Sequence, residues 1–404
     1  MSELRSSYDV VIVGGAVIGS AVAYYLTADP DFDGSVLMVE RDPTYIHAST
    51  ALSAASIRTQ FSNPLNVRMS QYAHDVIRDF PDLMEVDGHR PDLAFQAGGY
   101  MFLAGDEAQA AILQDNHEVQ TACGADVVLL EPDEIAQSFP HLRVHDLTLA
   151  SYGRRGEGWF DNTGLLQGFR NKARAQGAHV VHDEVVGIAR AGARVTGVRL
   201  ASGAEIGAGH VVNASGPRAA RTARMAGLEI PVEPRKRTTF AFICETSPEG
   251  TAQVNEGRLP LMVDPSGVYC RPEGAGFIAA APPKDDPEVD AEDFEPRYDE
   301  FEALVWPALA ARSQAFEAIR MTNAWAGHYA YNTLDHNMIV GPHPELENFL
   351  FANGFSGHGL QQAPAAGRGV AELIVHGRYR TLDLSPAGME RILTGTPFPE
   401  RAVI

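Results

Sequence analysis

The sequence predicts an α/β fold that opens with a parallel βαβ unit and later becomes rich in antiparallel strands. Residues 8–13 form an apolar run, a glycine turn and a helical stretch over 17–28 follow, and residues 35–40 form a second apolar run. This strand–helix–strand spacing is typical of a right-handed βαβ crossover. Between residues 179 and 213, short apolar runs alternate with glycines, which indicates a small antiparallel meander and a return strand to the main sheet.

The other elements follow from hydrophobic periodicity and from capping or turn residues. We expect helices over 63–80, from 106 onward, over 162–177 and over 358–376. We expect strands over 95–103, 233–245, 268–281 and 349–352. The proline- and aspartate-rich stretch 281–296 is expected to be an exposed loop.

Composition and charge narrow the class of protein. A chain of 404 residues with 45% hydrophobic and 21% charged residues is an ordinary globular protein, large enough for more than one domain. Its 52 acidic and 32 basic residues give a formal charge of −20, which disfavours nucleic acid as a partner. The three cysteines are widely spaced, and no targeting or transmembrane segment is evident, so we expect a cytoplasmic protein.

A glycine-containing motif joins the first expected strand to the first expected helix. Gly14 permits a tight turn, Gly19 lets the helix lie close to the strand, and the helix start would place backbone N–H groups against a pyrophosphate. Glu40 ends the second strand about 20 residues later, where a carboxylate accepts hydrogen bonds from ribose hydroxyls. Ala16 replaces the usual middle glycine and narrows the approach to the phosphates. The motif predicts a bound dinucleotide, either FAD or NAD(P).

Three later segments favour FAD over a nicotinamide nucleotide. Residues 47–58 carry small and hydroxyl side chains that suit a backbone lying against a flavin. Residues 211–217 combine a buried strand with a small-residue turn, and residues 353–362 form a strand-to-helix turn. The amino end of that last helix would stabilise negative charge on a reduced flavin, which a nicotinamide enzyme does not need.

These motifs together resemble the D-amino acid oxidase (DAO) superfamily of FAD-dependent oxidoreductases, in its sarcosine oxidase and dimethylglycine dehydrogenase branch. The similarity spans nearly the whole chain and is carried by Glu40 and by residues 14–19, 213–217, 325–335 and 354–364. It implies a Rossmann-type FAD-binding domain made of residues 1–85, 151–218 and 326–404. It also implies a discontinuous α+β substrate-binding domain, built on an antiparallel sheet and made of residues 86–150 and 219–325.

The resemblance implies that FAD contacts come from each of the motif segments. The expected cofactor-binding residues are Gly14, Gly15, Ala16, Val17, Ile18, Gly19, Glu40, Arg41, Ser49, Thr50, Ser53, Ala54, Ser56, Val185, Ala214, Ser215, Gly216, Gly354, Gly357, His358, Gly359, Leu360 and Gln361.

The resemblance also implies three catalytic residues, Arg58, Tyr269 and His328. Arg58 would favour the reduced flavin anion or bind a substrate carboxylate, and Tyr269 matches an aromatic residue of the substrate site. The alternative for each is a structural role: an ion pair for Arg58, core packing for Tyr269 and hydrogen bonding for His328. Phe61 and Gln361 stand where sarcosine oxidases carry two further cations, so sarcosine itself is not expected to be the preferred substrate.

Two departures from sarcosine oxidase bear on the cofactor and the electron acceptor. His328 stands where that enzyme carries its flavin-linked cysteine, and Leu52 lies near the histidyl attachment point of dimethylglycine dehydrogenase, so we expect noncovalent FAD. Residues 276–281 contain no lysine at the place where sarcosine oxidases activate O₂, which favours a dehydrogenase over an oxidase. No metal site is expected.

The expected reaction is oxidation of a C–N bond in an amino acid or N-substituted amino acid. Hydride transfer to flavin N5 would give an imine that hydrolyses. Two alternatives stay open: an FAD-dependent 2-hydroxy acid dehydrogenase, and a flavoprotein whose main role is assembly of a larger complex. The expected partners are a small amine or amino acid and an electron acceptor, which is O₂, a quinone or an electron-transfer protein.

Overall fold

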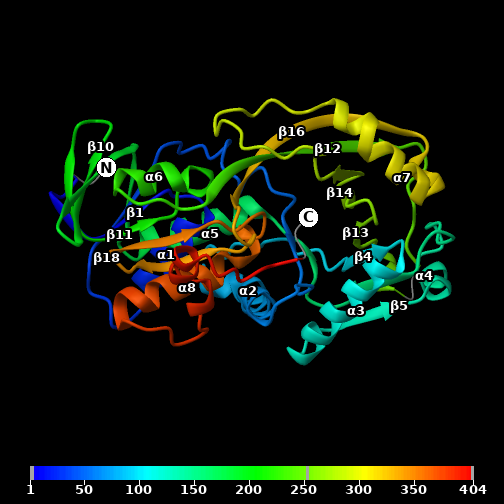
Figure 1. Cartoon of the computed structure of the whole chain (residues 1–404), viewed down its shortest axis with the longest axis horizontal. Helices are drawn as coiled ribbons and strands as arrows, with labels where there is room; N and C mark the ends of the chain where they lie inside the picture. The colour runs from blue at the N-terminus through cyan, green and yellow to red at the C-terminus, as the bar shows by residue number, and fades with distance from the viewer. Residues whose placement is uncertain (1–3, 252–253, 402–404) are drawn as a thin grey trace.

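Two large β-sheets frame the molecule in the computed structural model, which describes residues 4–251 and 254–401. Figure 1 shows the first sheet and its helices at one end of the long axis, and the second sheet at the other end. The chain crosses between the two parts several times. Strands β12 (Val232–Cys244) and β16 (Ile319–Asn332) extend from the second sheet over the first part.

The first sheet contains the expected βαβ unit. Its strands are, in spatial order, β17 (Ile339–His343), β18 (Leu346–Asn353), β11 (Glu205–Asn213), β1 (Ser7–Val13), β2 (Val36–Glu40) and β8 (His179–His182), with β10 (Arg194–Leu200) and β9 (Val185–Ala191) attached through β11. β1 pairs in parallel with both β2 and β11, and β18 pairs in parallel with β11. The expected meander is present as the antiparallel β9, β10 and β11.

Both faces of the first sheet are covered, which explains the continuous apolar run of β1. Val10 and Ile12 point into one hydrophobic cluster, whereas Val11 and Val13 point into another on the opposite face. The first cluster is shared with four helices: α1 (Val17–Ala28), α2 (Pro64–Leu83), α5 (Asn162–Ala175) and α8 (Gly359–His376). The second is covered by the meander and by α6 (Ala219–Met225).

The second sheet is mainly antiparallel. Its strands are, in spatial order, β16 (Ile319–Asn332), β12 (Val232–Cys244), β15 (Gly276–Ala280), β14 (Tyr269–Glu273), β13 (Leu261–Val263), β4 (Tyr100–Ala104), β6 (Leu149–Gly153) and β5 (Val127–Leu130). Phe240, Phe242 and Phe277 pack on one face, together with Val305 and Leu309. The opposite face is turned toward the first part of the molecule.

Short elements complete the fold. They are β3 (Ser56–Ile57), which pairs with β7 (Gly158–Trp159), and the helices α3 (Glu107–Ala122), α4 (Pro132–Ser138), α7 (Trp306–Arg312) and α9 (Glu390–Thr394). No helix among the described residues is long and apolar enough to cross a membrane.

Several expected elements differ in the structure: the stretch 268–281 is two strands, β14 and β15, β18 is longer than the expected 349–352, and α5 ends before 177. Two further differences have a visible cause. The strand expected over 95–103 is only Tyr100–Ala104, because Gly98 N–H donates to Gln96 O in a turn and interrupts the extended chain before Gly99. The helix expected to end at residue 80 continues through Pro81 to Leu83, since the turn after the proline still closes with a hydrogen bond from Met84 N–H to Phe80 O.

Candidate functional site

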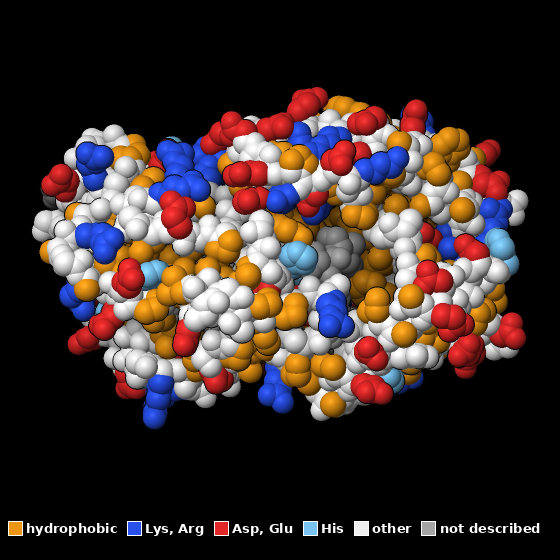
Figure 2. All heavy atoms as spheres, in the orientation of Figure 1, with side chains coloured by type: hydrophobic (Ala, Val, Ile, Leu, Met, Phe, Trp, Pro, Cys, Tyr) orange, Lys and Arg blue, Asp and Glu red, His pale blue; other side chains and the backbone are white. Residues whose placement is uncertain are grey.

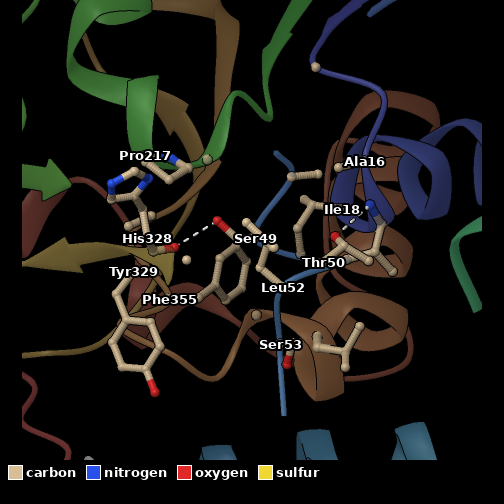
Figure 3. A pocket seen from close by; sticks show the side chains of 18 of the residues that line it. Ala16, Ile18, Ser49, Thr50, Leu52, Ser53, Pro217, His328, Tyr329 and Phe355 are labelled. Carbon is tan, nitrogen blue, oxygen red and sulfur yellow. Dashed lines mark hydrogen bonds between the residues drawn. The ribbon is translucent and has the colours of Figure 1, made fainter. Parts of the chain in front are cut away.

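A single continuous cavity runs from the parallel sheet to the inner face of the antiparallel sheet. It is lined at one end by Glu40 and Val185, passes the start of α1, and reaches Tyr100 and Tyr269 at the other end. Figure 3 shows its middle section, with Ala16 and Ile18 on one side and His328 and Tyr329 on the other.

The turn before α1 is shaped for close approach of a ligand. Gly14 has φ +98°, and a Cβ atom there would lie 2.5 Å from Ala214 O, so only glycine fits. Ala16 is the N-cap residue and has no side-chain acceptor, and the first turn of α1 contains no acidic residue. The helix N-terminus therefore presents backbone N–H groups and a positive dipole end to the cavity, which is the arrangement that binds phosphate.

Glu40 lies at the end of β2 on the cavity wall. Its Oε2 accepts a hydrogen bond from Gly15 N–H at 2.7 Å, and its Oε1 accepts one from Asp42 N–H at 2.8 Å. Burial raises the pKa of this carboxyl, although both hydrogen bonds act in the opposite direction. Because each carboxylate oxygen accepts a hydrogen bond from a different backbone segment, the side chain is held toward the nucleotide end of the cavity.

A second helix N-terminus, that of α8, meets the cavity from the C-terminal part of the chain. His358 is the N-cap residue and its side chain forms no capping hydrogen bond. Gly357 has φ +97°, and a Cβ atom there would lie 2.6 Å from Cε2 of Tyr329, so the turn packs directly against the second sheet. This contact brings the start of α8 to the tyrosine-lined end of the cavity.

The inner face of the second sheet carries three tyrosines. Tyr100 on β4, Tyr269 on β14 and Tyr329 on β16 all line the cavity, with Thr239 and Leu261 between them. Burial raises the pKa of each phenol, that of Tyr100 to about 12. The three hydroxyl groups are therefore neutral hydrogen-bond donors near neutral pH, and their rings can surround a cationic amine.

Arg58 follows β3 and is 2% exposed. One guanidinium nitrogen donates to Gln60 O, and Nη2 lies 3.2 Å from His358 Nε2. The guanidinium carbon lies 4.1 Å from the centroid of the Phe61 ring, and Arg58 N–H donates to Gln361 Oε1 at 2.9 Å. Arg58 thus links the predicted flavin segments at 47–58 and 353–362.

His328 lies on β16 at the cavity wall. Its backbone oxygen accepts a hydrogen bond from Ser49 Oγ at 2.7 Å, as Figure 3 shows, and its ring packs edge-on against Phe294. Burial lowers the pKa of the imidazole. Nε2 is buried and has no hydrogen-bond partner among the described residues, so an ordered water or a bound ligand could satisfy it.

Most of the residues expected to bind the cofactor line this cavity. Three do not: Gly19 packs behind the turn, where a Cβ atom would lie 1.9 Å from Gly14 O, and Gly15 and Gly354 also lie outside the lining. The expected catalytic residues Arg58, Tyr269 and His328 are all brought together on the wall.

Sequence reasoning missed several residues of the second sheet. Tyr100, Arg237 and Thr239 line the cavity but lie in no recognised motif, and Tyr329 lies in the 325–335 segment but was not predicted as a site residue. The alternation along β12 contained a usable signal, because residues 237 and 239 share one face while Phe240 and Phe242 share the other. The alternation could not show what lies against the face that carries residues 237 and 239.

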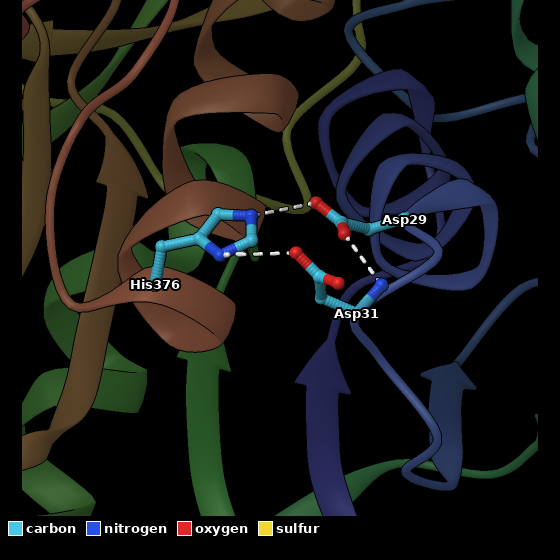
Figure 4. Close-up of side chains that lie close together, drawn as sticks. All are labelled: Asp29, Asp31 and His376. Atoms are coloured by element: carbon cyan, nitrogen blue, oxygen red, sulfur yellow. Dashed lines mark hydrogen bonds and ion pairs between the residues drawn. The ribbon is translucent and has the colours of Figure 1, made fainter.

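A separate polar cluster lies away from the cavity. Asp29 Oδ2 is 3.0 Å from His376 Nε2, and Asp31 lies on the other side of the same ring (Figure 4). Arg380 Nη1 is 3.8 Å from Asp31 Oδ2, so one of the two carboxylates already has a cation beside it. The cluster ties the C-terminal end of α1 to that of α8.

Comparison with known proteins identifies the family. The FAD dependent oxidoreductase family, DAO, matches residues 9–373 of the chain. The chain belongs to the DAO family. This DAO-family protein is 40% identical to FAD-dependent oxidoreductase domain-containing protein 1 of Xenopus laevis over 430 residues, which cover 98% of this chain and 85% of that protein. The assignment confirms the resemblance drawn from the motifs.

Two further relatives bear on the chemistry of this DAO-family chain. Sarcosine dehydrogenase of Mus musculus is 27% identical over 388 residues, which cover 93% of this chain and 40% of that protein. The solved structure of L-proline dehydrogenase from P. horikoshii superposes with a TM-score of 0.83 at 26% identity and covers 97% of this chain and 99% of that chain. The chain is an FAD-dependent oxidoreductase with the expected α/β fold, and these relatives are named for amino acid substrates.

The residues on the cavity wall fit FAD. A dinucleotide needs a carboxylate at its ribose, a helix N-terminus at its phosphates and a pocket for its ring system, and Glu40, α1 and the region near His358 supply these in order along one cavity. The buried, unpartnered Nε2 of His328 lies in the region left for the ring system. A nicotinamide dinucleotide would leave the start of α8 without a role.

Proposed function

We propose that this protein oxidises a C–N bond of an amino acid or N-substituted amino acid. The observation that carries the proposal is the chamber at the end of the FAD cavity, where three tyrosines and two arginines, Arg58 and Arg237, face one space. Aromatic rings favour a cationic amine, and guanidinium groups favour a carboxylate. A small molecule with both groups, an amino acid, matches this chamber better than a 2-hydroxy acid, which has the carboxylate but no amine.

The chain's own residues would orient the substrate and exclude water. When bound beside these residues, FAD would supply the two-electron acceptor for the hydride, and the substrate would be released as an imine that water hydrolyses to a carbonyl compound and an amine. Tyr100, Tyr269 and Tyr329 would surround the amine and orient the substrate for hydride transfer. The buried Arg58 would supply positive charge on the side of α8.

We propose that FAD is bound noncovalently by the cavity-lining members of the expected set. The lining contains no cysteine, and position 52 is leucine, which cannot form a covalent link. His328 has a buried imidazole with a lowered pKa, and we assign it to hydrogen bonding with the cofactor. Acid precipitation should therefore release the yellow colour into the supernatant, whereas a coloured pellet would contradict noncovalent binding.

The electron acceptor is proposed to be a carrier or quinone rather than O₂. Every basic residue that the structure places on the cavity wall is an arginine, apart from histidines, and Lys284 is exposed in the loop after β15. A mobile ammonium group that could stabilise developing superoxide is therefore missing from the wall. Stopped-flow mixing of reduced enzyme with O₂ should show slow reoxidation, and rapid O₂ turnover would refute the dehydrogenase assignment.

An anaerobic substrate panel tests the proposed reaction directly. The holoenzyme is mixed with N-methyl amino acids, D- and L-amino acids, cyclic imino acids and 2-hydroxy acids, and loss of flavin absorbance at about 450 nm is followed. We expect an amine-containing acid to bleach the flavin. Bleaching by hydroxy acids alone would favour a C–O oxidation, and stable copurification with a larger complex without any bleaching would favour an assembly role.

A further inference from the structure

Arg237 is one of the two arginines of the substrate chamber. It lies on β12, two residues before Thr239, and both residues line the cavity. Its guanidinium carbon lies 4.8 Å from the centroid of the Tyr329 ring, and its side chain is 14% exposed. Nε is buried and has no hydrogen-bond partner in the part of the chain that the structure describes. An anion in the chamber would give this donor a partner.

Asp286 holds the other two nitrogens of this guanidinium. Nη1 donates to Oδ1 at 2.6 Å and Nη2 donates to Oδ2 at 2.8 Å. This paired geometry is how a guanidinium binds any carboxylate. Asp286 comes from the loop after β15 and is more exposed than Arg237, at 27%. It therefore reaches Arg237 from the solvent side rather than from the core.

Arg58, the other arginine of the chamber, is less suited to bind a substrate carboxylate. Its guanidinium contacts Gln60 O and His358 and packs on the Phe61 ring, and the residue is 2% exposed. A carboxylate would have to displace these contacts from within the protein. At Arg237 it has only to exchange with a loop carboxylate.

We propose that Arg237 binds the carboxylate of the substrate, and that Asp286 is the resident anion with which it exchanges. The assignment rests on the proposed function, because it takes the substrate to be an amino acid. A carboxylate at Arg237 would keep the rest of the substrate next to Tyr329, on the same face of the second sheet as Thr239. Arg237 thereby selects small acids over the corresponding amines and amides.

Carboxylate probes that cannot be oxidised test the assignment. The holoenzyme is titrated with acetate, butyrate and benzoate and with the matching amides, and the change in the flavin absorbance spectrum is followed. We expect carboxylates to bind more tightly than their amides. Arg237→Gln should weaken carboxylate binding by roughly tenfold to a hundredfold, the loss expected for a charge-assisted contact, and leave amide binding unchanged. Arg237→Lys should retain part of the affinity because it keeps the charge.

Arg235 supplies a matched control on the same strand. It also pairs with a carboxylate, that of Glu233 at 2.5 Å, and lies 5.4 Å from the ring of Tyr331, but it does not line the cavity. Arg235→Gln should leave carboxylate binding unchanged. Asp286→Asn should tighten it, because the buried charge of Arg237 is then uncompensated. Equal carboxylate binding by the native protein and Arg237→Gln, or weaker binding by Asp286→Asn, would overturn the proposal.

The two proposals fail in different ways. If Arg237→Gln loses carboxylate binding but no amino acid bleaches the flavin, the carboxylate site stands and the proposed reaction does not. If an amino acid bleaches the flavin and carboxylate binding is independent of residue 237, the reaction stands and the assignment of Arg237 does not.

Discussion

Glu157 is the buried carboxylate that supports the Arg58 side of the cavity. It is fully buried, and its Oε1 accepts hydrogen bonds from Thr59 N–H at 2.8 Å and Thr59 Oγ1 at 2.5 Å. Its Oε2 accepts one from Gln60 Nε2 at 2.8 Å. Burial raises the pKa of this carboxyl, whereas the hydrogen bonds and the nearby charge of Arg58 act in the opposite direction. The segment that follows Arg58 is thus fixed from behind by one side chain.

Replacing this carboxylate should cost stability. In Glu157→Gln an amide NH₂ group faces the donors of Thr59 or Gln60, so at least one buried hydrogen bond is lost, at about 1–3 kcal/mol of unfolding free energy. Urea unfolding of the apoprotein measures the change. Glu118→Gln, at an exposed position on α3, is the control and should shift stability by less than about 0.5 kcal/mol. Equal effects of the two substitutions would show that the Glu157 contacts contribute nothing.

His141 predicts a pH dependence of stability. Burial lowers the pKa of its imidazole to about 4, and its Nδ1 has no partner among the described residues. In the unfolded chain the imidazole binds a proton near pH 6.5, so stability is lost as the pH falls from that value toward about 4. Between pH 6.5 and 5 the loss is about 2 kcal/mol. His141→Leu should remove this part of the pH dependence when unfolding midpoints at pH 7 and pH 5 are compared. An unchanged difference would contradict it.

For single residues, the sequence predicts those positions whose residue type is required by a local motif. Gly14 and Glu40 were identified because a turn and a strand end demand those residue types at that spacing. Arg237 and Glu157 were not identified, because their importance comes from partners at Asp286 and Thr59, which no local pattern reveals. Phe61 and Gln361 predict that two cations of the sarcosine oxidase site are absent, but they do not show where another charge would enter.

Among the elements, the loop over 282–296, which we call the acidic strap, does more than the exposed loop expected from its composition. Figure 1 shows it in yellow beside β12 and β16, and Figure 2 shows acidic and basic side chains together along this edge. Glu292 Oε1 receives hydrogen bonds from Arg41 Nη1 at 2.8 Å and Arg218 Nη2 at 2.5 Å, and both arginines line the cavity. The strap is therefore tied to two arginines of the cavity wall, although none of its own residues lines the cavity.

The strap should slow the release of FAD. The hydrogen bond from Arg41 is the main cause that lowers the pKa of Glu292, to about 2. The carboxylate is therefore ionised at neutral pH, and its ion pairs with Arg41 and Arg218, which we call the latch, are lost only as the pH falls from about 4 toward 2. Because Glu292 is partly exposed, each ion pair contributes little, and Glu292→Gln should speed FAD dissociation by about two- to fivefold. The measurement is the recovery of free-flavin fluorescence after dilution. Glu288→Gln, on the exposed side of the strap, should not change the rate, and equal rates for both variants would exclude the latch.

Element boundaries were predictable where the chain is locally consistent. The expected and observed bounds of α1 agree, since its apolar residues, its glycine turn and the following strand all point to the same ends. The strand at 95–103 was extended too far because its apolar residues continue through a glycine pair, while the structure turns there to let Gln96 bridge to Trp159. That bridge joins residues distant in sequence, so the local pattern could not contain it.

For the whole molecule, we propose the division into an FAD-binding and a substrate-binding domain that the resemblance implies. The expected boundaries at 151 and 326 fall inside β6 and β16, and both strands belong to the second sheet. Along the sequence, the segments of each domain are therefore separated by segments of the other domain. A cavity lined by both parts means that a cofactor bound there contacts the two domains at once.

This arrangement couples cofactor binding to the stability of the whole chain. A ligand that binds only the folded state raises the unfolding free energy by about 2.7 kcal/mol at a free concentration one hundred times its dissociation constant. Adding FAD to the apoprotein should therefore raise the midpoint of thermal unfolding by several degrees and keep a single transition. ADP, which can reach only the end near Glu40 and α1, should stabilise the protein less, because it leaves the wall around His328 and Tyr329 unfilled. If ADP stabilised the chain as much as FAD does, the flavin end of the cavity would contribute no binding energy, and the link between the two domains through the cofactor would be wrong.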